Sequence, residues 1–308
     1  MSTSEATRRS MRQALLTATL RNALRLFFKP LIRPALPITW QRRGVVALTA
    51  LGHQAQGVTL SAGRLAEVVI ETVLPQAPYP GKVILYLHGG AYILGSPRTH
   101  RSVVTHLAAA SGTEVVVADY RLAPEHPYPA APDDALQCYC SLLARGIAAQ
   151  DIRLAGDSAG GGLALALALR IRDEKLPLPG ALLLISPWVD LSLSGSSVTQ
   201  LRKRDPMLST SWLVQAAQLY AGSRALEHPG CSPLFADLRG LPPILIQVGS
   251  DEILLDDSRR LAARACEAGV AATLQVFDGM WHVFQTNAGM LDVADQAIQD
   301  LASFNQRI

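Results

Sequence analysis

The sequence predicts an α/β protein, with a mostly parallel sheet covered by helices on both faces. Short apolar runs, Ala- and Leu-rich segments between most of them, and a globular composition are the three observations behind this prediction. Nearly continuous apolar strands are typical of a sheet buried on both faces. The chain has 308 residues, of which 49% are hydrophobic and 17% charged, so disorder is excluded as its main state.

The expected strands and helices alternate along most of the chain. The apolar runs predict strands at residues 65–73, 82–87, 114–119, 151–155, 181–186, 244–248 and 273–277. The segments between them predict helices at residues 100–110, 131–145, 159–172, 256–269 and 289–305. This alternation implies crossover connections between parallel strands, with the helices packed on the faces of the sheet.

An amphipathic helix is expected near the start of the chain, over residues 10–28. Its apolar residues recur at helical spacing, with arginines between them: Leu16, Leu20, Leu24 and Phe27. The helix is expected to be stopped by three prolines, Pro30, Pro34 and Pro37. We predict that the apolar stripe packs on the rest of the molecule, with the basic residues on the solvated face, in preference to a membrane-surface helix or a transit peptide.

The interval from 187 to 243 interrupts the alternation, because it contains no strong strand and one helix-like segment at 211–220. Insertions of this length usually have a function. We predict that residues 1–45 form N-terminal cap helices and that residues 46–308 form the main domain, with a cap insertion at about 187–230. Both parts are expected to cover the carboxyl edge of the sheet.

Charge and composition exclude several classes of function. Residues 1–45 carry nine Lys and Arg against one acid, a charge of +8, and the rest carries 19 against 24, a charge of −5. A mildly acidic body argues against nucleic acid as a partner. No apolar run approaches the roughly 20 residues that cross a bilayer, so no membrane insertion is expected.

The cysteines are too few and too scattered for a disulfide framework or a zinc site. They are Cys138, Cys140, Cys231 and Cys266. We predict reduced thiols, mostly buried, and a cytoplasmic location. The sequence contains no motif for a metal or an organic cofactor, so none is expected.

A nucleophile motif, Gly-Asp-Ser-Ala-Gly, occupies residues 156–160, directly after an expected strand and directly before an expected helix. The pattern GxSxG in this context is typical of a strained turn that exposes the serine hydroxyl. Small residues two positions from the serine are required because larger side chains would clash. The spacing does not fit a P-loop or a GxGxxG phosphate-binding loop. Ser158 is therefore the candidate nucleophile.

The candidate base is His282. The order nucleophile, acid, histidine is usual for a serine on such a turn, with the histidine near the C-terminus. Among the seven histidines only His282 satisfies this order, in a turn directly after the strand expected at 273–277.

The acid is expected after the strand at 244–248, where Asp251 and Glu252 are both available. Asp256 and Asp257 fall in the first turn of the next expected helix, where carboxylates favour the helix dipole without a catalytic role. The residues by themselves do not decide between Asp251 and Glu252.

Consecutive small residues follow the strand at 82–87, in the segment His88-Gly-Gly-Ala91. Small side chains let backbone N–H groups face a ligand, which suits an oxyanion hole. The expected donors are the N–H groups of Gly89, Gly90 and Ala91, together with that of Ala159, the residue after the nucleophile.

These motifs together resemble the hormone-sensitive-lipase-like esterases, bacterial family IV, over about residues 55–306. The resemblance rests on His88-Gly-Gly, residues 119–130 (DYRLAPEHPYPA), the GDSAG motif, and the late acid and histidine. It implies an eight-stranded α/β-hydrolase core, an N-terminal pair of cap helices and serine-dependent ester hydrolysis without a cofactor. It also implies that the stretch containing Arg121 and Glu125 is structural, so neither is a catalytic candidate.

The sequence departs from the family pattern at two places. Ala91 replaces the usual third glycine and retains its N–H donor. The usual acid motif, Asp-Pro-Leu-Arg-Asp, corresponds to residues 252–256 when aligned from its last aspartate, and to Asp251 when aligned from the strand end. We choose Glu252, because its thirty-residue separation from His282 resembles the family's interval and because glutamate is a known variant of the acid.

The expected function is hydrolysis of short- to medium-chain carboxylic esters through an acyl-enzyme, because a cap limits the pocket. A lactone would suit the same chemistry. A non-catalytic receptor on the same scaffold is the alternative from another class, and the presence of all three triad residues in order argues against it. The expected partner is a small ester molecule, and the sequence leaves homodimer formation open.

Overall fold

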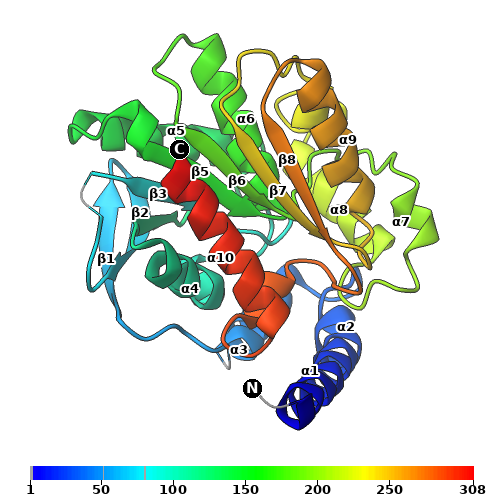
Figure 1. Ribbon diagram of the computed structural model, residues 1–308. Helices are drawn as coiled ribbons and strands as arrows, with labels where there is room; N and C mark the ends of the chain where they lie inside the picture. The colour runs from blue at the N-terminus through cyan, green and yellow to red at the C-terminus, as the bar shows by residue number, and fades with distance from the viewer. Residues whose placement is uncertain (1–2, 51, 80) are drawn as a thin grey trace.

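The computed structural model describes residues 3–50, 52–79 and 81–308, and an eight-stranded sheet lies at its centre (Figure 1). The strand order is β1-β2-β4-β3-β5-β6-β7-β8, and β2 runs opposite to the other strands. The strands are β1 (Val58–Leu65), β2 (Val68–Pro75), β3 (Val83–Leu87), β4 (Glu114–Ala118), β5 (Ile152–Asp157), β6 (Ala181–Ile185), β7 (Ile244–Gly249) and β8 (Ala272–Phe277). The predicted α/β class and mostly parallel sheet are confirmed.

One strand prediction is wrong. The single strand expected at 65–73 is an antiparallel hairpin, in which β1 and β2 meet at a turn that contains Ala66 with φ of 50°. The strand β1 lies at the edge of the sheet, and most of its side chains are exposed. An exposed edge strand needs no apolar run, so the hydrophobic pattern detected only its partner.

Helices cover both faces of the sheet, as predicted. On one face α4 (Arg101–Ser111) packs against α10 (Asp292–Arg307), and α5 (Ala130–Ala144), α6 (Ala159–Asp173) and α9 (Leu255–Glu267) cover the other (Figure 1). The pleat of β3 separates the two cores, because Leu85 and Leu87 belong to the α6 side whereas Ile84 and Tyr86 belong to the α4 side. Both cores are completely buried at this strand.

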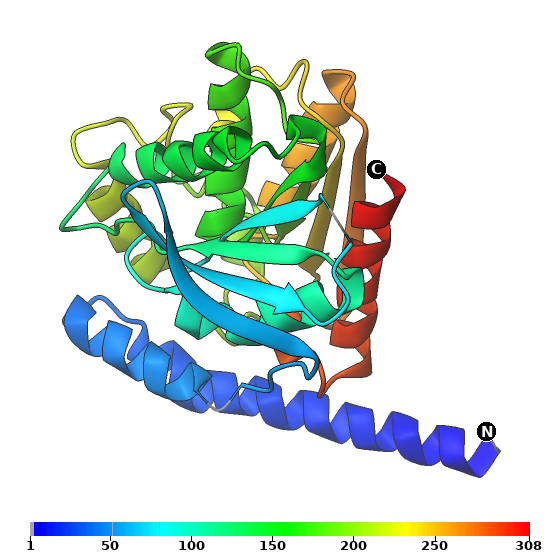
Figure 2. The same cartoon turned by 90° about the vertical axis from the view of Figure 1, so that its left-hand side faces the viewer.

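The N-terminal segment is a long helix that runs along one side of the molecule beside a second, shorter helix (Figure 2). It comprises α1 (Thr3–Ala23), a π-helical stretch η1 (Leu24–Phe28) and α2 (Lys29–Leu31), and it is followed by α3 (Ile38–Thr49). The helix continues beyond residue 28 and through Pro30, and it ends at Leu31, before Pro34 and Pro37. Pro30 is tolerated because it stands in the first turn of α2.

The apolar stripe of this helix packs on the body in part. Leu16, Leu20 and Leu24 contact the core beneath α4 and α10, as expected. Phe27 departs from the expectation, because 65% of its surface is exposed. The π-helical stretch inserts extra backbone per turn, which rotates the later residues away from the ideal stripe.

The interval after β6 contains α7 (Ser197–Gln200) and α8 (Thr210–Ala221), and it contacts the N-terminal helices. The Trp212 indole donates to Gln41 Oε1 at 2.9 Å, Lys29 donates to the Asp205 carbonyl at 2.7 Å, and Arg25 donates to the Arg204 carbonyl at 3.3 Å. The two predicted cap segments therefore touch. The proposed boundary at residue 45 falls inside α3, which ends at Thr49.

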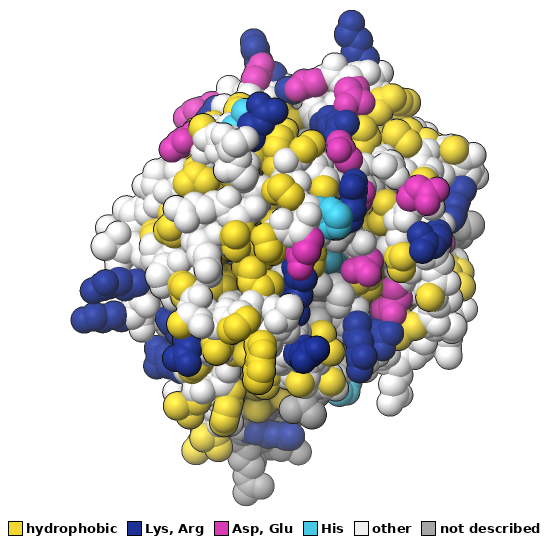
Figure 3. All heavy atoms as spheres, turned by 180° about the vertical axis from the view of Figure 1, so that it is seen from behind, with side chains coloured by type: hydrophobic (Ala, Val, Ile, Leu, Met, Phe, Trp, Pro, Cys, Tyr) yellow, Lys and Arg dark blue, Asp and Glu magenta, His cyan; other side chains and the backbone are white. Residues whose placement is uncertain are grey.

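Short 3₁₀ turns complete the structure at Pro97–His100, Ala149–Asp151, Pro233–Phe235 and Phe284–Asn287. All four cysteines are free; Cys138 and Cys231 are buried, whereas Cys140 is half-buried and Cys266 is exposed. No helix within the described residues is long and apolar enough to cross a membrane. The rear face carries scattered charges of both signs, with hydrophobic and basic side chains side by side in its lower part (Figure 3).

Candidate functional site

The turn from β5 into α6 holds Ser158 in a left-handed conformation, with φ of 53° and ψ of −123°. Such a conformation is costly for a residue with a side chain. The Ser158 N–H donates to the Ile185 carbonyl at 2.9 Å, and its carbonyl accepts from the Trp188 N–H at 2.8 Å. These bonds hold the strained turn against β6 and the segment that follows it.

Glycines on either side of the serine allow this turn to approach the end of β3. A Cβ at Gly160 would lie 1.9 Å from the Leu87 carbonyl oxygen, and a Cβ at Gly156 would lie 2.6 Å from the same atom and 2.4 Å from the Gly160 carbonyl oxygen. Any side chain at either position would therefore displace backbone. The predicted reason for the GxSxG pattern, lack of space, is confirmed at these two positions.

Asp157, the residue before the serine, fixes the loop after β3. Its carboxylate accepts from the Tyr86 hydroxyl at 2.8 Å and from the Gly89 N–H at 3.0 Å, and it lies 3.3 Å from His100 Nε2. Burial raises the pKa of Asp157, but the neighbouring His100 and the hydrogen bonds from its partners outweigh this effect and lower it. Asp157 therefore remains a carboxylate at neutral pH.

His88 lies inside the same loop and is neutral. Its ring is completely buried and stacks on Tyr120 with 4.3 Å between ring centroids. Burial lowers its pKa to about 3. The Tyr120 hydroxyl donates to the His88 carbonyl at 2.6 Å, and Arg121 pairs with Asp134, so the stretch that begins at residue 119 supports the loop.

His282 lies in the loop after β8, next to Val283, which has φ of 51°. Only 2% of His282 is exposed, and its Nδ1 is hydrogen-bonded to Glu252 Oε2. Burial lowers the pKa of His282, but the charge and hydrogen bond of Glu252 outweigh burial and raise it. With Nδ1 engaged, Nε2 is the nitrogen available to take a proton from a group in the cavity.

Glu252 is completely buried, and its second oxygen is held by other groups. Oε1 accepts from the Ser186 hydroxyl at 2.9 Å and from the Gly249 N–H at 3.0 Å. The Ser186 hydroxyl also accepts from the Val283 N–H at 3.2 Å, so one serine joins the acid to the histidine loop. The structure thus places Glu252, the residue chosen from the alignment, on His282.

Asp251 points elsewhere. Its carboxylate pairs with Arg21 at 2.8 Å and lies 2.7 Å from Arg204. Asp256 and Asp257 begin α9, as expected, and contact the segment after β6. Burial raises the pKa of Asp257 to about 8, and it accepts from the N–H groups at 189 and 190. None of these three carboxylates is hydrogen-bonded to His282.

The expected oxyanion donors divide into two groups. The Gly89 N–H donates to the Asp157 carboxylate at 3.0 Å, so the structure does not support the expectation that it donates to a substrate oxygen. Within the described residues, no hydrogen bond uses the N–H groups of Gly90, Ala91 or Ala159. Gly90 and Ala91 have φ of 119° and 54°, which turns the backbone sharply at this point.

Ser186 and Asp157 are the site residues that sequence reasoning missed. Asp157 lies inside the recognised GDSAG motif, but its bond to Gly89 spans 68 residues and has no local signature. Ser186 stands at the end of the strand predicted at 181–186, with φ of 45°. A polar residue at the carboxyl end of a parallel strand was the only available signal.

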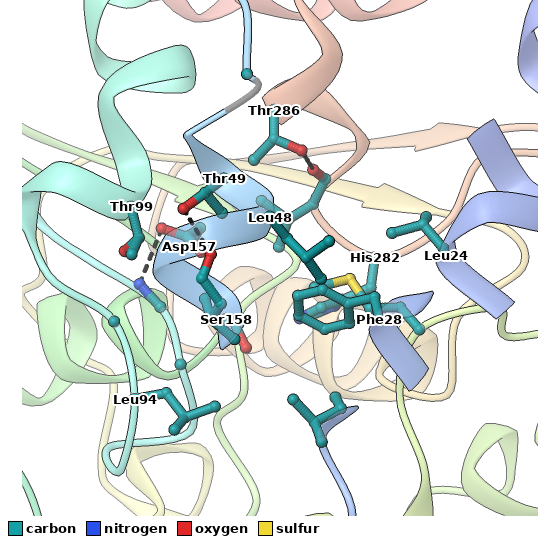
Figure 4. Close-up of a pocket in the computed structure, with 18 of the residues that line it drawn as sticks. Leu24, Phe28, Leu48, Thr49, Leu94, Thr99, Asp157, Ser158, His282 and Thr286 are labelled. Carbon is teal, nitrogen blue, oxygen red and sulfur yellow. Dashed lines mark hydrogen bonds between the residues drawn. The ribbon is translucent and has the colours of Figure 1, made fainter. Parts of the chain in front are cut away.

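Ser158 and His282 line one cavity of about 460 Å³. Figure 4 shows Leu24, Phe28, Leu48 and Leu94 around the space beside Ser158, with the first two on the N-terminal helix and Leu48 on α3. Gly90 and Ala91 line the same cavity. Its wall is mostly apolar, so it suits a small molecule with a hydrocarbon part. No cluster of His, Cys, Asp or Glu in the described ranges is arranged to hold a metal.

Known proteins of similar sequence and structure are esterases and hydrolases. A family profile described as the alpha/beta hydrolase fold matches residues 84–286. An esterase of Acinetobacter venetianus is 40% identical over 95% of this chain and 94% of its own, and an acetyl-hydrolase of Streptomyces hygroscopicus is 43% identical over 73% of this chain and 75% of its own. The crystal structure of an esterase from the bacterial hormone-sensitive lipase family has a TM-score of 0.90 at 38% identity, covering 96% of this chain and 97% of that one.

The strained turn predicts that Ser158→Gly stabilises the protein. Glycine adopts positive φ without a Cβ penalty, which outweighs its larger entropy loss on folding, so the free energy of unfolding should rise by about 1 kcal/mol. Ser158→Ala retains the Cβ and should leave it nearly unchanged. Urea denaturation of the three proteins measures the difference, and equal stability of the glycine and alanine variants would contradict a strained serine.

Proposed function

Because the chain belongs to the hormone-sensitive-lipase-like esterases of the α/β-hydrolase fold, we propose that it cleaves short- to medium-chain carboxylic esters through an acyl-enzyme on Ser158. The chain is a carboxylic ester hydrolase of that family. The observation that carries the finer proposal is one apolar cavity lined by both a strained serine and a histidine bound to a buried glutamate.

In the first half-reaction, His282 Nε2 takes the hydroxyl proton of Ser158 while Oγ attacks the ester carbonyl carbon. The carbonyl oxygen becomes an oxyanion, and the free N–H groups of Gly90, Ala91 and Ala159 are placed to donate to it. Each such donor is typically worth about 3 kcal/mol at the transition state. Collapse breaks the bond to the alkoxy group, which leaves as an alcohol with the proton from His282.

In the second half-reaction, water replaces the alcohol. His282 takes a proton from the water as its oxygen attacks the acyl carbon, and the same oxyanion donors stabilise the intermediate. Cleavage returns the proton to Ser158 Oγ and releases the carboxylic acid. Glu252 holds the imidazole through Nδ1 and stabilises its cation in both steps, without becoming protonated.

The size and lining of the cavity support an acyl chain of short or medium length. A volume of about 460 Å³ lies in the range of small-molecule sites, so a short- or medium-chain ester fits in it. Leu20, Leu24 and Phe28 bring the N-terminal helix into the wall, so this helix limits the length that fits. Cap helices at residues 1–45 and a cap insertion at about 187–230 are part of the proposal.

Ser158→Ala should lower kcat for p-nitrophenyl butyrate by several orders of magnitude, because only oxyanion binding and substrate positioning would remain. Circular dichroism and thermal unfolding should stay as in the wild type, because the substitution preserves backbone and packing. Substantial turnover by a homogeneous Ser158→Ala preparation would remove this serine from the mechanism.

Glu252→Gln should lower kcat at least a hundredfold, and Asp251→Asn should cost clearly less. The two variants also differ in pH dependence. Activity requires neutral His282, so kcat/KM rises as pH increases through its pKa. Because the charge of Glu252 raises that pKa, removing the charge should move the acid limb of the profile to lower pH. Asp251→Asn should leave the limb in place.

The opposite ranking of these two variants, with Asp251→Asn crippled and Glu252→Gln nearly normal, would show that Asp251 is the acid. Rate profiles between pH 5 and 9 on the same ester series separate the two assignments.

Leu24→Trp should shift the acyl preference towards shorter chains, because Leu24 lines the cavity and the larger side chain would occupy part of its volume. The ratio of kcat/KM for p-nitrophenyl hexanoate to that for the acetate is the measurement, and it should fall several-fold. Leu15→Trp is the matched control, because Leu15 is 71% exposed on the same helix and does not line the cavity. An unchanged ratio in Leu24→Trp would place the acyl chain elsewhere.

A further inference from the structure

Arg21 on α1 joins the N-terminal helix to both loops that carry the proposed acid and base. Its Nη1 donates to Asp251 Oδ2 at 2.8 Å, and its Nη2 donates to the Gly279 carbonyl. The guanidinium carbon lies 5.5 Å from the centre of the Trp281 ring, which is within cation–π range. Asp251 precedes Glu252, and Trp281 precedes His282.

The basic residues of this helix were expected on its solvated face. This expectation is wrong for Arg21, because only 19% of its side chain is exposed.

Asp251, the partner of Arg21, is a buried carboxylate that pairs with two arginines. Its side chain is 6% exposed, and Arg204, from the segment after β6, forms a second ion pair with its other oxygen. Burying a carboxylate is costly unless it is paired or hydrogen-bonded, and the two arginines supply this compensation for Asp251. Asp251 therefore forms ion pairs both with Arg21 of the N-terminal helix and with Arg204 of the segment after β6.

The two loops are already bound to each other beneath Arg21. The Asp251 N–H donates to the Met280 carbonyl at 2.9 Å, and the Gly279 N–H donates to the Ser250 hydroxyl at 2.8 Å. They lie so close that a Cβ at Gly249 would be 2.3 Å from the Met280 carbonyl oxygen. A displacement of either loop would be transmitted to the other, and with it to the bond between Glu252 and His282.

The residues beside Arg21 on the helix form the cavity wall. Leu20 and Leu24 line the cavity, as does Trp281 under the guanidinium. The same helix segment thus forms part of the cavity wall and is hydrogen-bonded to the two loops. Arg25 and Lys29, one and two turns further on, donate to the backbone carbonyls of Arg204 and Asp205.

We propose that Arg21 is a positioning residue which, through Asp251 and the Gly279 carbonyl, couples the seating of the N-terminal helix over the cavity to the alignment of Glu252 with His282. This inference rests on the proposed function, because it assigns Arg21 a role in the acylation carried out by that pair. Asp251, the other candidate for the acid, then has the role of holding the N-terminal helix in place through its ion pair with Arg21.

The chemistry of the contact requires arginine. The planar guanidinium donates to a carboxylate and a carbonyl on different loops while its face covers an indole ring. A lysine retains the charge, but its ammonium lacks the flat fork that serves both loops and the ring together. Arg21→Lys therefore tests the geometry separately from the charge.

The experiment compares five variants with the wild type: Arg21→Met, Arg21→Lys, Asp251→Asn, the double variant Arg21→Met/Asp251→Asn, and Arg12→Met. Arg12 is exposed on the same helix and is the matched control. We would measure kcat and KM for p-nitrophenyl acetate and hexanoate, together with the thermal unfolding temperature of each protein.

Arg21→Met and Asp251→Asn should each lower kcat for both esters about tenfold and raise KM for hexanoate more than for acetate. The double variant should be no worse than the worse single variant, because both substitutions break one contact. Arg21→Lys should retain less than half of the wild-type kcat, and Arg12→Met should match the wild type.

Multiplicative losses in the double variant would overturn the coupling, since the two residues would then act separately. Lower unfolding temperatures with unchanged kcat and KM would also overturn it, because the contact would then be structural alone. Wild-type kcat in Arg21→Lys would overturn the two-loop geometry. These outcomes differ from a failure of the proposed function, which would appear as absent turnover or an unaffected Ser158→Ala enzyme.

Discussion

The close approach of the β5–α6 turn to the end of β3 is the constraint on which the site depends. Gly156 and Gly160 leave no room for a side chain, and Ser158 takes a left-handed conformation between them. The serine is thereby lifted above the carboxyl end of the sheet. The same approach brings the turn that carries Ser158 and Ala159 next to the loop after β3, so the proposed nucleophile and the proposed oxyanion donors follow from one packing contact.

Buried carboxylates then fix the surrounding loops. Asp157 accepts hydrogen bonds from the Gly89 N–H and the Tyr86 hydroxyl, and these bonds hold the loop after β3. Glu252 accepts hydrogen bonds from the Ser186 hydroxyl and the Gly249 N–H, and these bonds hold it beside His282. Each charge is out of water, so its hydrogen bonds are stronger than they would be at the surface. Burial by itself lowers the pKa of His282, but the charge and hydrogen bond of Glu252 outweigh burial and raise it, and this pKa sets the pH at which the proposed base becomes competent.

The N-terminal helix forms part of the apolar wall of the cavity that contains Ser158 and His282. Leu20 and Leu24 face the cavity. Arg21 contacts the loop that carries the proposed acid, and Arg25 and Lys29 contact the segment after β6. Because this wall is a separate helix, a change in the proposed acyl preference does not require a change in the strained turn. The helix must then be held in place over the cavity, and Arg21 contacts both loops that carry the proposed acid and base.

Local pattern determined the class of fold and the candidate serine, because strand and helix periods and the GxSxG turn depend on neighbouring residues. The candidate histidine followed from its place in the order of nucleophile, acid and histidine along the chain. The apolar strands were found for the same reason, whereas the exposed edge strand β1 was missed because it buries little. Whether Glu252 or Asp251 contacts His282 depends on which way two adjacent side chains point. The hydroxyl of Ser186, which binds both Glu252 and the Val283 N–H, helps to decide this. The engagement of the Gly89 N–H by Asp157, 68 positions away, and the pairing of Arg21 with Asp251, 230 positions away, likewise have no trace in local sequence. Only the tertiary structure brings such partners together, because hydrogen bonds and ion pairs act over a few ångströms in space whatever the separation along the chain.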